Sequence, residues 1–401
     1  MIKNYLITFW NVLQRHKFFT FVSLFGISIT LMVLIVLSAV YDSTFGSHGP
    51  EKNKENLLYI FGGTFKNDKN NSRMRGSASY YFYDQTLRKM KLPERVSILS
   101  LPSSVTCYSG DHKITAMRKY TDADFWEIFS FDFIKGKPYL PMDVDLANKV
   151  IVVDRITALH YFGTTDCLGK TMKIDGFDFT VRGVIEETSI NRTFPFANIY
   201  QPFTTAGTDY LEKRINGSFV GVIQVKEGTD PDKVKAEYQK TLRDFQFPDP
   251  EEWSKVSSYA DRYLEVFTRN LLRGEESTQI GLFILILAVL LLLFMSFPAL
   301  NLVNINITRI LERASEIGIR RSFGASVKIL LIQFLILNVI LGLFGLLWYN
   351  INLRKAEIGL RRALGAIGCS LLFLYGLIIL CALAPSKQAS EVDPAVALYE
   401  E

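Results

Sequence analysis

The chain has 401 residues, of which 49% are hydrophobic, 13% aromatic and 21% charged, and its formal net charge is +5. This length allows about two or three compact units, and so small a net charge gives no indication of a nucleic-acid partner. The apolar excess lies near both ends of the chain, which is typical of membrane spans that flank a soluble domain.

Residues 1–17 are predicted to form an amphipathic helix, because apolar side chains recur at helical spacing on one face. Such a helix lies in the membrane interface, although a plain extension of the first span explains the pattern equally well. The segment contains Lys3, Arg15 and Lys17 but no acidic residue. Since Lys and Arg concentrate on the cytoplasmic side, the N-terminus is predicted to be cytoplasmic.

Residues 18–41 are predicted to form the first span. No charged residue occurs between Lys17 and Asp42, and the 24 residues exceed the roughly 20 that cross a bilayer. The apolar stretch is longer than the core of a secretory signal, so we expect an uncleaved anchor.

The first span delivers residues 42–276 to the outer side, and we expect this segment to be a mixed α/β domain. Apolar runs, alternation and turn residues predict its elements. The expected strands are 57–61, 150–153, 170–174, 177–184 and 219–225, with a hairpin turn at Asp175-Gly176; the expected helices are 78–90, 155–162 (stopped by Gly163) and 230–245. Residues 255–277, which are charged and compatible with a helix, are predicted to form a stalk that leads into the second span.

The sequence contains no pattern of an enzyme. None of its four histidines belongs to a metal-binding or nucleophile-activating motif. The segment Gly163–Thr171 resembles a phosphate-binding P-loop, but five residues separate its glycines where the motif needs four. Cys107 and Cys167 could pair, although two separate thiols are the expected state. We therefore expect no catalytic, cofactor or metal site.

Three further uncharged stretches predict spans at residues 277–308, 329–349 and 367–386. Residues 309–328 are rich in arginine and are predicted to be a cytoplasmic loop. The expected fold class is an α-helical membrane bundle of about four spans, with the mixed α/β domain inserted between spans one and two. Residues 350–366 and the tail 387–401 complete the chain.

Several motifs occur within this architecture. Asp124–Phe129 followed by Gly136-Lys137 lies in the outer segment, as does Tyr161-Phe162-Gly163 running through Gly169-Lys170 to Arg182-Gly183-Val184. Glu316–Arg321 with Gly324-Ala325 lies in the loop, and Ala384-Pro385-Ser386 to Leu398 forms the ending. With these motifs the chain resembles the MacB/FtsX-type permeases of ABC transporters.

The resemblance implies a permease in the bacterial inner membrane, with its large domain in the periplasm and the lipid bilayer around its spans. The implied function of this permease is export, efflux or mechanotransmission, driven by a separate cytoplasmic ABC ATPase. It also implies a homodimer, or a heterodimer with a second permease, together with a periplasmic adaptor. The residues implied to couple the permease to the ATPase are Glu316, Gly318, Arg320, Arg321 and Gly324.

The coupling motif occurs twice, at 313–325 and again at 354–366. If both later spans cross the membrane, the second copy lies outside with four basic residues, against the positive-inside tendency. Burying it would cost about 2.5–3.5 kcal/mol for each Arg or Lys on insertion scales. Our hypothesis is a rearranged C-terminal part, formed by fusion of two related permease ends.

Two other classes of function compete with the permease. An extracytoplasmic sensor or receptor would also place one domain between spans, but no cytoplasmic segment is large enough for a kinase or cyclase. A membrane enzyme would need a nucleophile, a metal or an acid–base cluster, and the sequence offers none.

Overall fold

The structure is a computed structural model. It describes residues 32–293, except 34, 48, 70, 110 and 111, and also residues 296, 319 and 322–324. Two compact units are distinguished: one is Ser43–Phe283, and the other combines Met1–Asp42 with Ile284–Glu401. Within the described residues, no helix is both long enough and apolar enough to cross a membrane.

The unit Ser43–Phe283 contains a seven-stranded sheet in the order β7-β10-β8-β11-β6-β5-β9. The pairs β8–β10 and β6–β11 are parallel, and the other pairs are antiparallel. Its strands are β5 (Ser103–Ser109), β6 (His112–Thr121), β7 (Phe133–Gly136), β8 (Val150–Asp154), β9 (Thr171–Ile174), β10 (Phe177–Ile185) and β11 (Ile199–Pro202).

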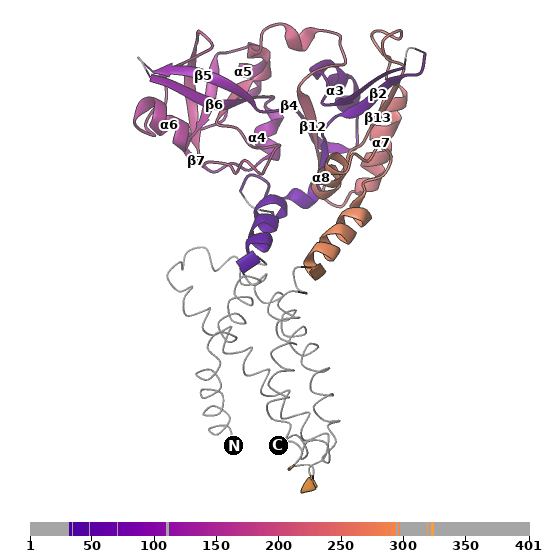
Figure 1. The fold of residues 1–401 in the computed structure, drawn as a ribbon. Helices are drawn as coiled ribbons and strands as arrows, with labels where there is room; N and C mark the ends of the chain where they lie inside the picture. Colours follow the sequence, from indigo (N-terminus) through magenta and orange to yellow (C-terminus); the bar gives the residue numbers. More distant parts are fainter. Residues whose placement is uncertain are drawn as a thin grey trace. The chain divides into compact units, whose positions relative to one another are not determined.

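Two antiparallel three-stranded sheets complete the unit, in the orders β1-β12-β4 and β13-β2-β3. Figure 1 shows them beside the seven-stranded sheet, together with α3 and α7. Their strands are β1 (Leu57–Ile60), β2 (Gly63–Asn67), β3 (Ser72–Gly76), β4 (Pro93–Ser100), β12 (Phe219–Val225) and β13 (Lys255–Ser258).

The helices between residues 54 and 271 are short, apart from α7. They are α3 (Tyr80–Leu87), α4 (Asp124–Ile128), α5 (Pro141–Asp145), α6 (Arg155–Phe162), α7 (Pro231–Arg243) and α8 (Tyr263–Leu271), with 3-10 turns at Lys54–Asn56, Phe203–Thr205 and Asp209–Leu211. One apolar cluster joins the seven-stranded sheet to the β1-β12-β4 sheet, because buried side chains of β1, β4 and β12 share it with those of α4, β8 and β11. A second cluster joins Phe65 of β2 to buried side chains of β1, β4 and β12. The three sheets are therefore linked through the β1-β12-β4 sheet and belong to one compact unit.

Most elements predicted for the outer segment are confirmed. Helix α6 has the predicted bounds: the Asp154 carboxylate accepts a hydrogen bond from the amide of Thr157 at 2.7 Å, and Gly163 ends the helix in a left-handed conformation. The hairpin of β9 and β10 turns at Asp175 and Gly176, which both have positive φ.

The predicted stalk at 255–277 is wrong in two places. Residues 255–258 form strand β13, in which exposed and more buried side chains alternate with the period of a strand rather than a helix. Helix α8 ends at Leu271, and the following turn contains Arg273 and Gln279 with φ of +52° and +57°. Such left-handed residues interrupt a right-handed helix.

The predicted helix 1–17 and the segments 329–349, 350–366, 367–386 and 387–401 lie outside the described residues. Of span 18–41, residues 32, 33 and 35–41 are described and helical. Of span 277–308, residues 280–293 and 296 are described and helical. The four spans therefore stay predictions.

Asp154 is expected to stabilise the outer domain through two hydrogen bonds at once. Besides capping α6, its carboxylate accepts from the side-chain amide of Asn198 at 2.7 Å. Loss of a cap costs about 0.5–2 kcal/mol. The half-buried amide of Asn198 also loses its partner, which adds part of the roughly 1–3 kcal/mol that a fully buried unpaired group costs. Asp154→Ala should therefore lower the free energy of unfolding by about 2–4 kcal/mol, measured by urea unfolding of the purified chain.

The control is Asp178→Ala, which removes an exposed carboxylate from β10 that has no hydrogen bond or ion pair within the described part of the chain. It should leave the midpoint of unfolding almost unchanged. Equal midpoints for the two variants would show that the cap of α6 contributes nothing.

Candidate functional site

The predicted ATPase-coupling residues are only partly visible. Glu316, Gly318, Arg320 and Arg321 lie outside the described residues, whereas Gly324 is described, in a turn with φ of +88°. Just before it, the amide of Phe323 donates to the carbonyl of Ile319 at 3.1 Å, as in a helix. The coupling role of this segment stays a prediction.

A site that the sequence did not reveal lies where the chain enters and leaves the outer domain. We name the meeting of residues 43–54, 189–194 and 263–283 the junction. Phe45 contacts the rings of Tyr263 and Phe267, with ring centroids 5.8 and 5.3 Å away. Phe267 in turn contacts Phe283 at 5.8 Å. An aromatic chain therefore connects the incoming segment directly with the outgoing one.

One fully buried carboxylate, that of Glu51, is the centre of the junction. It accepts hydrogen bonds from the hydroxyl of Tyr59 at 2.7 Å and from Nη1 of Arg192 at 2.8 Å. The ammonium group of Lys54 lies 3.2 Å from it. The single negative charge of Glu51 thus forms ion pairs with both Lys54 and Arg192, whose side chains are almost completely buried.

Both cations also hold the incoming segment through its backbone. Nη2 of Arg192 donates to the carbonyl of Gly46 at 3.0 Å, and Nζ of Lys54 donates to that of Thr44 at 2.8 Å. Lys54 lies 3.7 Å from the ring centroid of Tyr263 on α8, a cation–π contact. Through this one side chain the incoming segment, the buried carboxylate and α8 are linked.

The electrostatics follow from burial. Burial lowers the pKa of Lys54, while the neighbouring Glu51 opposes this effect. The pKa of Tyr59 is raised well above its usual value, first by burial and then by the charge of Glu51, so its hydroxyl keeps the proton that it donates. The cluster is built to hold fixed charges and hydrogen bonds rather than to transfer protons.

The loop 189–194 is tied down from a second side. The hydroxyl of Tyr263 donates to the carbonyl of Asn191 at 3.0 Å. Nζ of the buried Lys119, on β6, donates to the carbonyls of Thr193 and Phe194. Burial holds the pKa of Lys119 well below its usual value. The junction is thereby attached to the seven-stranded sheet.

Within the described residues, no group of three or more His, Cys, Asp or Glu side chains could hold a metal ion. Cys107 and Cys167 are buried free thiols, which confirms the expectation of two separate cysteines. Burial raises the pKa of Cys107 to about 11, so this thiol is a poor nucleophile. The segment after Gly169 is strand β9, which confirms that the P-loop resemblance is false.

No spacing rule predicts the junction. Glu51 and Lys54 look like solvated charges that follow a span, and Arg192 comes 141 residues after Glu51. The uncharged stretch between Lys17 and Asp42 predicts the span, but it gives no sign that the charges after it are buried.

Removal of the shared carboxylate should destabilise the outer domain strongly. Glu51→Ala leaves Arg192 and Lys54 buried without their counter-charge, and such losses cost about 3–5 kcal/mol. The matched control is Lys52→Ala, because the neighbouring Lys52 makes only an exposed pair with Asp132 and exposed pairs contribute little. Urea unfolding followed by tryptophan fluorescence compares the two. If the Glu51→Ala variant unfolds at the same urea concentration as the Lys52→Ala control, the buried cluster does not stabilise the junction.

Comparison with known proteins gives the chain a family. The family model described as the MacB-like periplasmic core domain matches residues 20–241. Two similar relatives are macrolide export ATP-binding/permease proteins MacB. The one from Aggregatibacter actinomycetemcomitans is 24% identical over 84% of this chain and 50% of its own length; the one from Haemophilus ducreyi is 22% identical over 98% and 55%. The chain thus spans about half the length of these curated relatives.

Two solved structures are also similar. The periplasmic region of MacB from Actinobacillus actinomycetemcomitans is 20% identical with a TM-score of 0.38, covering 47% of this chain and 83% of its own. The extracellular domain of the noncanonic ABC-type transporter YknZ from Gram-positive bacteria is 16% identical with a TM-score of 0.39, covering 50% and 99%. Since the family model matches more than half of its residues, the chain belongs to the MacB/FtsX-type ABC transporter permease family and carries a MacB-like periplasmic core domain.

Proposed function

We propose that the chain is the permease subunit of an ABC transporter. In this proposal, ATP hydrolysis on a separate cytoplasmic ATPase moves the membrane spans, and the spans move the outer domain for export, efflux or mechanotransmission. The relatives bear names that combine an ATP-binding part with a permease. The present sequence, by contrast, contains no P-loop motif of the required spacing.

The observation that carries the proposal is the junction. Movement of a span can reach the outer domain only if the connecting segments are held firmly, because energetic coupling needs packed elements with defined arrangements. The incoming segment is bound through Glu51, Lys54 and Arg192, and it contacts α8 through Phe45. Displacement of either segment would therefore act on the other and on the domain core together.

The outgoing segment is equally well held, although it is not a continuous helix. Thr268 Oγ1 donates to the carbonyl of Thr278 at 2.6 Å. Nη1 of Arg269 donates to the carbonyls of Glu275 and Ser277 at 3.1 and 3.3 Å. The turn after α8 is thus attached to α8, which replaces the rigidity that an unbroken helical stalk would provide.

Lipid is the environment we propose for the helical residues after this turn. Nine large apolar side chains between residues 282 and 293 are 41–63% exposed, including consecutive ones that point to different sides of the helix. A helix that is apolar all round suits a membrane. With it we propose an inner-membrane location and a periplasmic outer domain, with assembly as a homodimer, or as a heterodimer with a second permease, and a periplasmic adaptor.

Association with an ATPase tests the proposal. Glu316→Ala or Arg320→Ala should weaken co-purification of the ATPase at least tenfold. Removal of one partner from a desolvated charge pair costs about 2–5 kcal/mol, and a factor of ten needs only about 1.4 kcal/mol. The measurement is pull-down of the ATPase from membranes that contain equal amounts of each variant.

The second copy of the motif supplies the matched control. Glu357→Ala and Arg361→Ala make the same changes at 354–366 and should weaken association much less. If only the second-copy variants lose the ATPase, the coupling segment has been assigned to the wrong repeat. Saturable ATP binding by the purified chain alone would contradict the need for a separate ATPase.

A further inference from the structure

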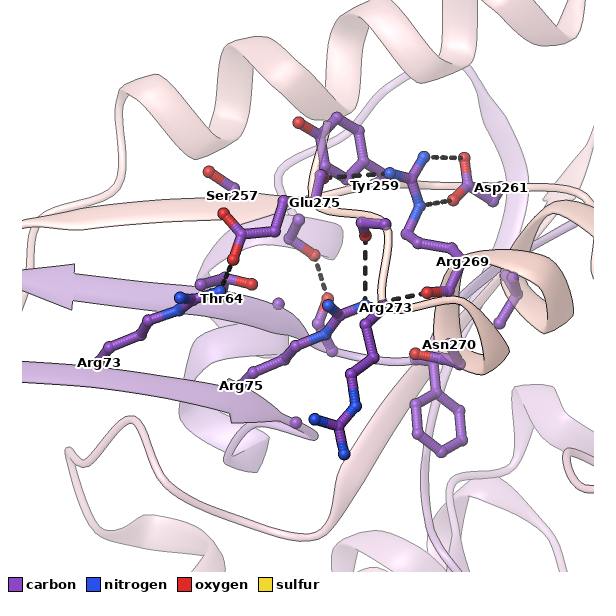
Figure 2. A pocket seen from close by; sticks show the side chains of 17 residues that line it. Thr64, Arg73, Arg75, Ser257, Tyr259, Asp261, Arg269, Asn270, Arg273 and Glu275 are labelled. Atoms are coloured by element: carbon purple, nitrogen blue, oxygen red, sulfur yellow. Dashed lines mark hydrogen bonds and ion pairs between the residues drawn. The ribbon is translucent and has the colours of Figure 1, made fainter. Parts of the chain in front are cut away.

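A cavity of about 620 Å³ lies between the β13-β2-β3 sheet and α8 with the turn that follows it. Figure 2 shows arginine side chains from both sides of this cavity: Arg73 and Arg75 come from β3, whereas Arg269 and Arg273 come from α8 and the turn. Among the described residues that line it, only Asp261 and Glu275 carry a carboxylate. Its lining therefore carries an excess of positive charge.

Both carboxylate oxygens of Asp261 are bound by one arginine, Arg269. These oxygens accept from Nε and Nη2 of Arg269 at 2.6 and 3.3 Å. The same guanidinium lies 4.1 Å from the ring centroid of Tyr259. Arg269 is thus neutralised and held in place, and it forms a wall of the cavity rather than a free cation.

Glu275 is shared by two other cations. One of its oxygens lies 2.8 Å from Nζ of Lys66, and the other pairs with Arg73. Its single negative charge does not neutralise the two positive charges of Lys66 and Arg73. Glu275 therefore cannot neutralise any other arginine of the cavity.

Among the residues that the structure describes, Arg75 and Arg273 have no carboxylate partner. Nη2 of Arg75 donates to the carbonyls of Arg269 and Gly274 at 3.0 and 3.2 Å, which holds the guanidinium but does not neutralise it. Burial, followed by the charges of Arg269, Arg73 and Arg273, lowers the pKa of Arg75. Arg273 is exposed and makes no hydrogen bond or ion pair with any residue that the structure describes. The repulsion among these cations would be relieved by a bound anion.

We propose that this cavity binds a phosphate monoester, with Arg75 and Arg273 as its anchors. A phosphate monoester carries about −1.5 to −2 charges at pH 7, which matches two uncompensated guanidinium groups. The planar fork of arginine binds phosphate oxygens in pairs. The volume lies within the roughly 300–1,000 Å³ of small-molecule sites and exceeds the needs of a phosphate ion. An organic group is thus expected beside the phosphate.

Two sources share this chemistry: a soluble organic phosphate and a phospholipid headgroup that ends in a phosphate monoester, as in phosphatidic acid. Glu275 precedes the predicted span 277–308 by two residues in the sequence, so a lipid headgroup is a natural candidate. The inference does not rest on the proposed coupling to an ATPase, because it concerns only side chains within the outer unit.

The test is titration of the purified full chain in detergent by calorimetry with two matched probes, glycerol 3-phosphate and dihexanoyl phosphatidic acid. They share the phosphate monoester and differ in the acyl chains. Binding of both with similar affinity supports a soluble phosphate, and at least tenfold tighter binding of the lipid supports a headgroup. Dihexanoyl phosphatidylcholine controls for the acyl chains alone.

Arg273→Gln should weaken binding of both phosphate probes at least tenfold, which corresponds to about 1.4 kcal/mol. Since Arg273 has no partner in the described structure, this change should not affect folding. Arg75→Lys, which keeps the charge but loses the fork, should weaken binding as well. The control Arg243→Gln removes an exposed arginine at the end of α7, outside the cavity lining, and should bind like the original chain.

Three results would overturn the proposal. The first is no binding of either phosphate probe to the original chain. The second is equal affinity of the Arg273→Gln variant and the original chain. The third is binding of phosphatidylcholine as tight as that of phosphatidic acid, which would assign the binding to the acyl chains and not to the arginines.

Discussion

The buried carboxylate of Glu51 is the interaction on which the arrangement of the outer domain most depends. It lies fully buried between Arg192 and Lys54, and these two side chains bind the backbone of residues 44–46. Without this acid, Arg192 would have to move toward water, and Lys54 would have to move toward water or lose its proton. The charge of Glu51 therefore fixes where the incoming segment meets loop 189–194 and α8.

Local features of the fold were predictable, because their determinants lie close together in the sequence. Asp154 and Gly163 mark both ends of α6, and Asp175-Gly176 marks the turn between β9 and β10. The stalk was predicted wrongly because charged residues suit an exposed helix and an edge strand alike. Only pairing with β2, which lies 189–195 residues earlier in the chain, makes 255–258 a strand.

The functional regions also divide into one that could be predicted from neighbouring residues and one that could not. The motif that contains Glu316 and Arg320 is a contiguous stretch of sequence, so its resemblance to a family could be recognised without a structure. The arginine-lined cavity could not be found in this manner, since its cations come from Arg73 and Arg75 on one side and from Arg269 and Arg273 almost 200 residues later. Ordinary surface arginines look the same in a sequence; only the count of carboxylates around them distinguishes the cavity.

The turn after α8 determines how the outgoing segment responds to load. Arg273 and Gln279 have left-handed backbone conformations, which cost about 1–2 kcal/mol each for residues other than glycine. The turn is kept in this form by the hydrogen bonds of Thr268 and Arg269 to its carbonyl groups. In the proposed permease, a pull on residue 280 would first load these hydrogen bonds, and once they broke the turn would extend with release of its strain. The turn would then act as a link with a yield force: pulls too weak to break the bonds would reach the outer domain, and stronger ones would lengthen the turn.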